Sequence, residues 1–427
     1  MSDEEIVPAK TRRRSKRNAS IESEHDTDEG IETESLSTIS SRRSSVASLN
    51  ASRTENKKRK GRGKYKRPKL YEYVNHIKED HGGTIFGIHL HQNNTNGDNY
   101  LFATVGKNQV SIYEVSKTGK VKLLQSYCDP DTKEHFYTSA WTTDYQGICY
   151  LAVAGLNGVI RVINPYLMRC VKHYVGHGHA INELMFHTLD PNILISASKD
   201  QSIRMWNIKT DLCVAILAGS EGHRAEVLSV DINMQGDYLT SAGMDHSLKI
   251  WNLGKKEVKD AIKLSYEFRT GQKPFPTLIE DSAEFTTRDI HKNYVDCVRW
   301  VGECILSKSC ENQIVLWKPG RFSDKKVDYS KTKFFSIIHI FELKDCELWY
   351  MRFSLDFLKK TLALGNTSGK IYVWNMDVEQ PDSIKHTILS HQKCSSAIRQ
   401  TQLSSNGSLL LAACDDGTIW IWQRNSS

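Results

Sequence analysis

Histidine, serine, aspartate and tryptophan recur along the sequence in one fixed order that could support proton-transfer chemistry. A histidine beside a carboxylate is a general acid–base pair in many enzymes. Two units carry the complete order: His177, Ser196, Asp200 and Trp206, then His223, Ser241, Asp245 and Trp251. They could be taken for catalytic dyads. Because the sets recur as a structural period, however, the pattern favours a structural role.

The tryptophans belong to a longer repeat that begins after residue 80. Short β-rich runs end, again and again, in an aromatic or apolar residue followed by a polar one. Seven residues share this position: Tyr113, Ile163, Trp206, Trp251, Trp317, Trp374 and Trp422. Each follows a polar turn that contains one of these residues: Lys107, Asn157, Asp200, Asp245, Glu311, Ser368 and Asp416. Such self-similarity along a sequence indicates that one supersecondary unit is repeated.

These units resemble the WD40 repeat, in which the four marker side chains form a hydrogen-bonded chain within each unit. Such a chain is physically reasonable, because a buried imidazole needs a carboxylate and a hydroxyl, and an indole N–H needs an acceptor. Unit five substitutes Glu311 for the aspartate, and unit seven has Ala412 in place of the serine. Four units have the upstream histidine: His177, His223, His291 and His391.

The resemblance implies an all-β fold, a seven-bladed WD40 β-propeller over residues 71–427. Seven four-stranded sheets around a channel leave only short, protected sheet edges. The ring must close, and the segment "YEYVNHI" (71–77) is placed to supply the outer strand of the last blade. Two long connections, near 253–288 and 321–340, interrupt the period and are expected to form surface excursions.

Aromatic residues stand near the start of three predicted inner strands. The apolar pattern of units three to five fits "LWYMRF" (348–353) and places Trp349 one residue after the first core position. Side chains alternate along a strand, so this residue should face a rim of the channel. Phe86 and Tyr137 take the same position in units one and two, and ring closure brings these units near unit six. With Tyr350, the group suits a methylated ammonium; the alternative is that the rings pack beneath loops.

A basic segment precedes the predicted propeller. The net charge is +7, and residues 1–70 account for all of it. This segment is rich in Ser and poor in large apolar residues, which predicts a disordered tail. Its Lys/Arg clusters at 11–17 and 57–69 are typical of nuclear import signals or of contact with nucleic-acid phosphates. A merely solubilising tail is the alternative.

Other classes of site have little support. The ten cysteines form no C-x-x-C pair and no zinc-type spacing, which favours free thiols in a reducing compartment. No apolar run approaches the roughly 20 residues of a membrane span. We therefore expect no metal, no cofactor and no membrane partner.

Longer segments point beyond the generic repeat. The stretches "YVGHGHAINELMFH" (174–187), "TTRDIHKNYVDCVRW" (286–300) and "LWYMRFS" (348–354) resemble the Polycomb WD-repeat family called embryonic ectoderm development or extra sex combs. The similarity runs from about Tyr71 to Arg424. It implies a non-catalytic core subunit of Polycomb repressive complex 2, a nuclear, chromatin-associated complex that methylates histone H3 and silences genes.

The same resemblance implies partners and a site. One propeller face is expected to bind a trimethylated lysine of the histone H3 tail through an aromatic cage: Phe86, Tyr137, Trp349 and Tyr350. The opposite face is expected to hold an N-terminal helix of the SET-domain catalytic subunit, alongside other subunits of the complex. Binding of the mark would then stimulate methylation allosterically. The basic tail would add a weak contact with nucleic acid.

Three alternative functions have less support in the sequence. An enzyme is disfavoured because the sequence has no P-loop, no H-E-x-x-H and no G-x-S-x-G motif. A ubiquitin-ligase substrate receptor would want an F-box helix or a WDxR signature, but the units here end in "WNIK", "WNLG", "WKPG" and "WNMD". A nucleic-acid tethering factor would bind through its tail, with affinity that falls steeply as salt rises.

Overall fold

The computed structural model describes residues 70–92, 99–269, 273–324 and 326–425. All of these described residues belong to one compact unit. The predicted tail, residues 1–70, lies outside the described residues except for Leu70. Its two basic clusters therefore lie outside them as well.

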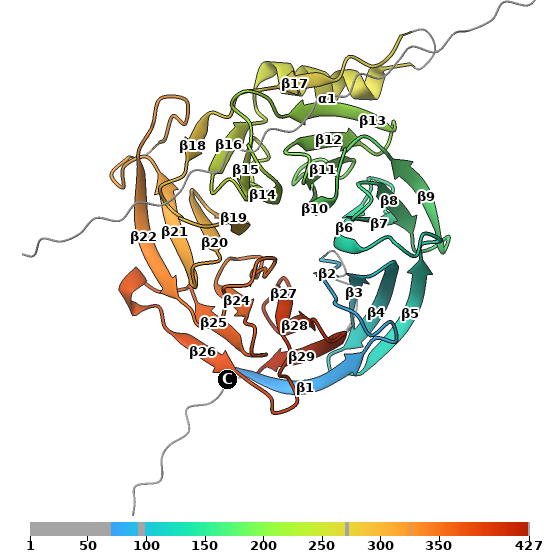
Figure 1. Cartoon of the computed structure of the whole chain (residues 1–427), viewed down its shortest axis with the longest axis vertical. Helices are drawn as coiled ribbons and strands as arrows, with labels where there is room; N and C mark the ends of the chain where they lie inside the picture. Colours follow the sequence, from blue (N-terminus) through green and yellow to red (C-terminus); the bar gives the residue numbers. More distant parts are fainter. Residues whose placement is uncertain (1–69, 93–98, 270–272, 325, 426–427) are drawn as a thin grey trace, which may run out of the picture. The chain divides into compact units, whose positions relative to one another are not determined.

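Seven sheets stand as blades around a central channel, which is the propeller predicted from the repeats (Figure 1). In each blade the first strand lines the channel and the last lies at the periphery. Blades one to three consist of β2 (Gly87–Leu90), β3 (Asn99–Gly106), β4 (Gln109–Ser116) and β5 (Val121–Cys128); β6 (Phe136–Thr143), β7 (Cys149–Gly155), β8 (Ile160–Asn164) and β9 (Arg169–Tyr174); and β10 (Ile181–Phe186), β11 (Ile193–Ser198), β12 (Ile203–Asn207) and β13 (Leu212–Leu217).

The remaining blades follow the same plan, and the last one closes the ring. They consist of β14 (Val227–Ile232), β15 (Tyr238–Gly243), β16 (Leu248–Asn252) and β18 (Phe285–Thr287); β19 (Val295–Val301), β20 (Cys304–Ser309), β21 (Gln313–Pro319) and β22 (Phe335–Glu342); β23 (Ser354–Leu355), β24 (Thr361–Gly365), β25 (Ile371–Asn375) and β26 (His386–Leu389); and β27 (Ile398–Leu403), β28 (Leu409–Cys414), β29 (Thr418–Arg424) and β1 (Tyr71–Lys78).

Strand β1 supplies the outer strand of blade seven, as the segment 71–77 predicted. It runs antiparallel to β29, with Tyr73 opposite Trp422. The two ends of the described chain therefore share one sheet, so that blades six, seven, one and two lie next to one another around the ring (Figure 1).

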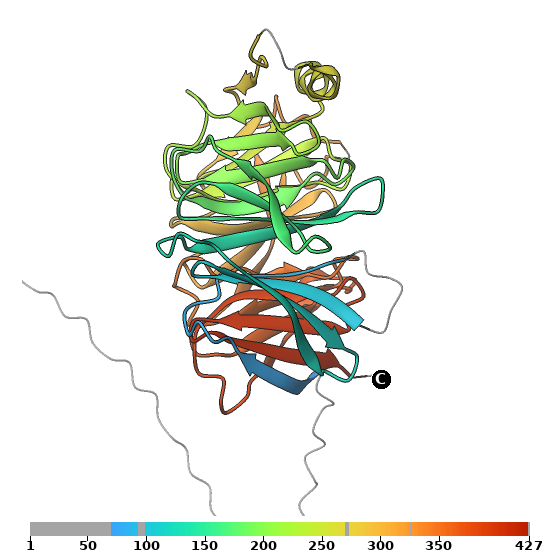
Figure 2. The same cartoon turned by 90° about the vertical axis from the view of Figure 1, so that its right-hand side faces the viewer.

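The first excursion contains an element that the sequence interpretation missed. Helix α1 (Lys256–Glu267) buries Val258, Ala261 and Ser265, one stripe at helical spacing, and β17 (Leu278–Glu280) adds a parallel strand beside β13. Both elements lie outside blade three (Figures 1 and 2). The second excursion was predicted too long, since β22 already begins at Phe335.

Apolar side chains pack between the faces of neighbouring blades. One cluster joins Ile195 and Met205 of blade three to Val230 and Trp251 of blade four. The tryptophan position of the repeat therefore fills the space between blades.

Both complete marker sets form the expected hydrogen-bonded chain. His177 lies 2.8 Å from Asp200 and 2.7 Å from the Ser196 hydroxyl, to which the Trp206 indole donates at 2.9 Å. The second set has the corresponding distances of 3.1, 2.8 and 2.9 Å. Burial lowers the pKa of His177 in spite of the neighbouring Asp200, so the imidazole is neutral and works as a structural connector.

Two units with substituted markers have incomplete chains. His291 still contacts Ser307 at 2.7 Å, but Glu311 lies 3.7 Å from its other nitrogen. In blade seven, where Ala412 replaces the serine, the buried indole N–H of Trp422 has no hydrogen-bond partner within the described residues. Packing therefore carries more of the stability of these blades.

Candidate functional site

Five inner strands share a β-bulge near their start. In each of them one residue is left out of the ladder: Tyr137, Asn182, Leu228, Asp296 and Arg399. A bulge bends the strand and changes the direction of the extra side chain. These are the positions that the sequence comparison treated as equivalent, so that comparison was correct for blades two, three, four, five and seven.

The register predicted for blade six was wrong. In blade six Ser354 pairs with Ala363, and the equivalent pair in blade five is Arg299 with Leu306. The frame predicted for 348–353 is therefore two residues out of register, and most of this segment is irregular chain instead of strand. In blade one, Gly87 pairs with Val105 as Cys297 pairs with Lys308 in blade five, so Phe86 takes the position of Asp296 and the predicted register is correct.

Trp349 thus reaches the rim by a route other than the bulge, whereas Phe86 takes the position in blade one that the bulge residues take elsewhere. Phe86 precedes the first residue of β2. Tyr350 adopts a left-handed backbone conformation with a φ of 64°, which is uncommon for a residue with a side chain. Its hydroxyl donates to the carbonyl oxygens of Tyr137 at 2.7 Å and Asn182 at 3.0 Å. These bonds, made with two other blades, hold the turn in place.

The structure brings the four predicted aromatic residues together. The Phe86 ring centroid lies 5.1 Å from that of Tyr137 and 5.4 Å from that of Tyr350, both edge to face. The Tyr137 and Tyr350 centroids are 6.1 Å apart, and Trp349 meets Tyr350 edge to face at 5.9 Å. We call these four residues the aromatic quartet. They come from blades one, two and six, as ring closure predicted.

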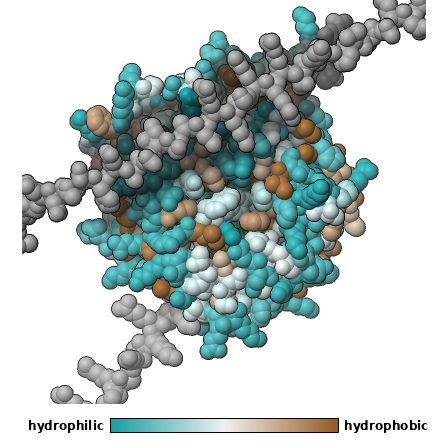
Figure 3. All heavy atoms as spheres, viewed as in Figure 1, coloured by the Kyte–Doolittle hydropathy of each residue, from teal (hydrophilic) through white to brown (hydrophobic). Residues whose placement is uncertain are grey.

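The members of the quartet differ in exposure. Trp349 is 41% exposed and Tyr350 only 3%, while Phe86 and Tyr137 are half-buried. Burial raises the pKa of the Tyr350 phenol, which is therefore neutral. The quartet has one exposed indole over a nearly buried phenol. On the propeller face visible in Figure 3, hydrophobic residues form small separate groups in a largely hydrophilic surface.

Two arginines that the sequence interpretation did not assign to the site lie against the quartet. The Arg352 guanidinium carbon is 4.5 Å from the Tyr350 ring centroid, and that of Arg399 is 5.7 Å from the Phe86 centroid. Arg399 also donates to the carbonyl oxygen of Trp349 at 3.0 Å. The sequence comparison had already placed Arg399 at the position equivalent to Tyr137, which could have assigned it to the site. Arg352 gave none, because the predicted register was wrong there.

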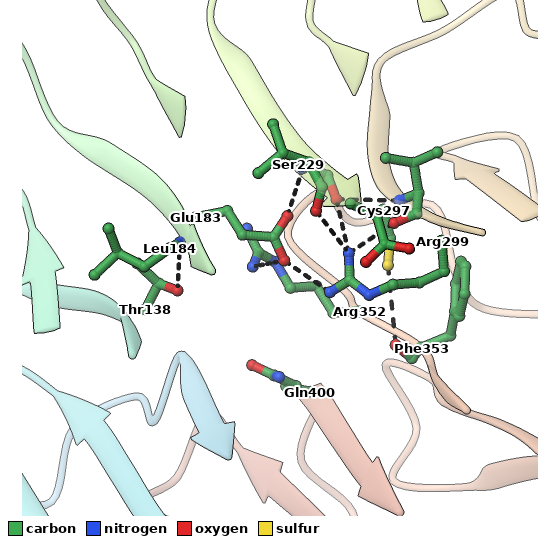
Figure 4. Close-up of polar contacts among 12 residues, drawn as sticks. Thr138, Glu183, Leu184, Ser229, Cys297, Arg299, Arg352, Phe353 and Gln400 are labelled. Atoms are coloured by element: carbon green, nitrogen blue, oxygen red, sulfur yellow. Dashed lines mark hydrogen bonds and ion pairs between the residues drawn. The ribbon is translucent and has the colours of Figure 1, made fainter. Parts of the chain in front are cut away.

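Each arginine is paired with a carboxylate. Glu183 lies 2.9 Å from Arg352 and 2.7 Å from Arg299, in the middle of the channel (Figure 4). Burial alone raises the pKa of Glu183, but the charges of Arg299 and Arg352 outweigh burial and lower it, so the carboxylate is ionised. Asp415 accepts from Arg399 at 2.9 Å.

A cavity opens at the other mouth of the channel. The blades repeat one topology, so their inner strands run the same way, and strand starts and strand ends lie at opposite mouths. The quartet comes from the starts. The cavity, of about 370 Å³, is lined by residues from later positions, among them Trp141, Phe186, Arg299 and Gln402. Arg299 therefore lines the cavity, and it also contacts Glu183, which pairs with Arg352 beneath the quartet.

Other chemistry finds little support in the described part of the chain. Among its residues no group of three or more His, Cys, Asp or Glu side chains is placed to hold a metal ion. No helix within those same ranges is long and apolar enough to cross a membrane. The ten cysteines are free thiols.

Comparison with known proteins agrees with the repeats. The family "WD domain, G-beta repeat" matches residues 168–207, 213–252 and 383–423. Fold and repeats together define a WD40 β-propeller protein. The chain is 46% identical to Polycomb protein esc of Drosophila virilis over 362 residues, 83% of this chain and 84% of that protein. It is 42% identical to Polycomb group protein FIE1 of Oryza sativa subsp. japonica over 323 residues, 75% of this chain and 84% of the relative.

The chain therefore belongs to the esc/FIE family of Polycomb WD-repeat proteins. A chain of ctPRC2, solved in complex with H3K27me3, has a TM-score of 0.69 to this structure at 21% identity, over 83% of this chain and 98% of the other. That likeness is one of fold.

Proposed function

We propose that this protein is a non-catalytic, nuclear subunit of Polycomb repressive complex 2 that reads trimethylated lysine on the histone H3 tail. Membership of the esc/FIE family supports the assignment to a Polycomb complex. The observation that carries the reader function is the meeting of Phe86, Tyr137, Trp349 and Tyr350, from three blades, at one mouth of the channel.

The quartet suits a quaternary ammonium because the faces of aromatic rings carry negative electrostatic potential, and four rings lie close together here. A cation within about 6 Å of an aromatic centroid is attracted by the quadrupole of the ring, with roughly 0.5–1 kcal/mol at exposed sites and about 2 or more when desolvated. Methylation keeps the charge of lysine but reduces the cost of removing its water. Aromatic faces therefore compete better for trimethyllysine than for the unmodified, strongly hydrated ammonium.

In the proposed complex the protein also works as a scaffold. An N-terminal helix of the SET-domain catalytic subunit would bind the propeller face opposite the quartet, beside the other subunits. A histone mark bound at the quartet would then favour the active arrangement of the catalytic subunit. For this to occur, the marked tail must bind the active state more tightly, and such coupling is typically about 1–3 kcal/mol.

Alanine variants of the quartet test the reader function. Phe86→Ala and Trp349→Ala should each weaken binding of an H3K27me3 peptide by roughly 1–2 kcal/mol, because each removes a ring face. Phe334→Ala is the matched control, since this exposed aromatic lies in the loop before β22, away from the quartet. Circular dichroism should show folded protein in all three variants. Affinities equal to that of the wild type would remove the quartet from the binding site.

Reconstitution tests the scaffold function. The isolated protein should have no methyltransferase activity, and its addition to the catalytic subunit should raise the activity of that subunit. The H3K27me3 peptide should raise it further with the wild type and much less with Trp349→Ala. A complex whose activity is the same with and without this protein would contradict the allosteric function.

A further inference from the structure

Two permanent positive charges border the quartet, which is an unusual surrounding for a site that would bind a cation. The guanidinium of Arg352 lies beneath Tyr350, and that of Arg399 lies over Phe86. Both occupy the kind of ring-face position that a ligand ammonium would use. An arginine at such a place fills one face of the ring and also repels a second cation.

The size of that repulsion follows from the distances. Arg352 is 4.5 Å from the Tyr350 centroid, and a ligand cation on the ring system would sit within roughly 6 Å of a centroid, about 10 Å from the guanidinium. At an effective dielectric constant of about 20, two unpaired like charges at that separation weaken binding by a factor of roughly 10–20. Left unpaired, Arg352 would cancel much of the attraction of the rings.

The protein places one carboxylate on each of these arginines. The Glu183 side chain is 4% exposed and lies 2.9 Å from Arg352, between Arg352 and Arg299 (Figure 4). Asp415 lies on Arg399, near the surface, with its side chain 27% exposed. Neither carboxylate is among the quartet residues, and each contacts an arginine instead.

We propose that Glu183 and Asp415 determine the cation selectivity of the quartet by offsetting the positive charges of Arg352 and Arg399. This proposal rests on the proposed reader function and adds to it two residues that never touch the ligand. They are positioning residues for charge: they hold the two arginines as packing groups while cancelling the field that would reject an ammonium. The preference of the site for trimethyllysine over a neutral group of the same shape then depends on the net charge beside the rings as well as on the rings themselves.

The test compares two H3K27me3-type peptides by calorimetry. One carries trimethyllysine, and the other carries a neutral isostere in which a tert-butyl group replaces the trimethylammonium. In Glu183→Gln, affinity for the trimethyllysine peptide should fall roughly tenfold, from the Coulomb estimate above, while affinity for the neutral peptide stays within about twofold. Asp415→Asn should show the same pattern with a loss of roughly threefold, because water screens this more exposed pair.

Two controls separate charge from folding. Glu79→Gln buries an amide in the same way, and Glu79 hydrogen-bonds Thr104 and Tyr113 instead of an arginine of the quartet. It should leave both affinities unchanged. Since Glu183 also holds Arg299, the Gln variant is checked by thermal unfolding; if it does not fold, the Asp415→Asn result decides, because that side chain is part-exposed.

Each outcome bears on the proposal. Selective loss of the trimethyllysine peptide supports it. Equal losses for both peptides, in a folded variant, would show a merely structural role for the carboxylate, and unchanged affinities would show none. A wild-type protein that binds the trimethylated and unmodified peptides equally would refute the reader function itself. A wild type that prefers the mark, with unchanged selectivity in both variants, would overturn only the role of the carboxylates.

Discussion

The ion pair of Lys308 with Asp296 links the core of blade five to the turn that carries Trp349 and Tyr350. Both side chains have 0% exposure, and the ammonium lies 2.9 Å from each carboxylate oxygen. Burial alone would lower the pKa of Lys308, but the charge of Asp296 outweighs it and raises the pKa, so the lysine is charged. Asp296 also accepts the backbone N–H of Met351 at 3.0 Å, next to the left-handed Tyr350.

Replacing Lys308 by methionine should therefore destabilise the propeller strongly. The change leaves a buried carboxylate without its counter-ion, which typically costs about 3–5 kcal/mol. Asp296→Asn, in the converse way, leaves a buried ammonium with a neutral amide and should cost a similar amount. The double variant Lys308→Met with Asp296→Asn removes both charges, while the amide oxygen can still accept from Met351, so its cost should fall to about 1 kcal/mol.

Urea unfolding followed by fluorescence measures all four proteins, and the coupling energy comes from the double-mutant cycle. We expect the summed losses of stability of the two single variants to be far larger than the loss of the double variant. In the folded double variant, binding of the H3K27me3 peptide should be retained because the Met351 contact survives. Additive costs, or a double variant less stable than either single one, would refute the view that a desolvated charge pair holds this turn.

Three further predictions concern the blade markers. Ala412→Ser should stabilise the protein by about 0.5–1.5 kcal/mol, because it offers an acceptor to the Trp422 indole, which has no hydrogen-bond partner among the described residues; a loss of stability in urea unfolding would contradict this. Burial raises the pKa of Asp200, but the hydrogen bonds that it receives from His177, Ser202 and the backbone N–H of Gly178 outweigh burial and lower the pKa. The stabilisation by Asp200 is complete above about pH 4, which is the pKa of its carboxyl group in the unfolded chain, and it is lost as the pH falls further. The difference in stability between the wild type and Asp200→Asn should therefore decrease below about pH 4. Burial also lowers the pKa of His291 to about 4, so wild-type stability should decrease as pH falls from about 6.5 to 4, and His291→Gln should flatten that slope.

The fold could be predicted from the sequence because its signals are local and repeated. The tryptophan period gave seven blades, and the closure by β1 followed from the need to complete the ring. Helix α1 interrupts the β period and has only a short buried stripe, Val258, Ala261 and Ser265, at helical spacing, so the repeat pattern does not predict it. A single helix inside a long excursion produces no repeat.

The site was predicted less well than the fold. The identities of the four aromatic residues came from the family resemblance together with a register that was correct for Phe86 and Tyr137 and wrong for Trp349. The reason is physical: the turn at Tyr350 is fixed by hydrogen bonds to Tyr137 and Asn182, in other blades, and no local pattern encodes such contacts. The pairing of Glu183 with Arg352 is equally non-local.

Calorimetry of the wild-type protein with H3 peptides that differ only in lysine methylation tests the central claim most directly. The quartet should bind the H3K27me3 peptide at least about tenfold more tightly than the unmodified peptide, a difference of about 1.4 kcal/mol. Equal affinities for the two peptides would contradict the claim that Phe86, Tyr137, Trp349 and Tyr350 form a site for a methylated ammonium.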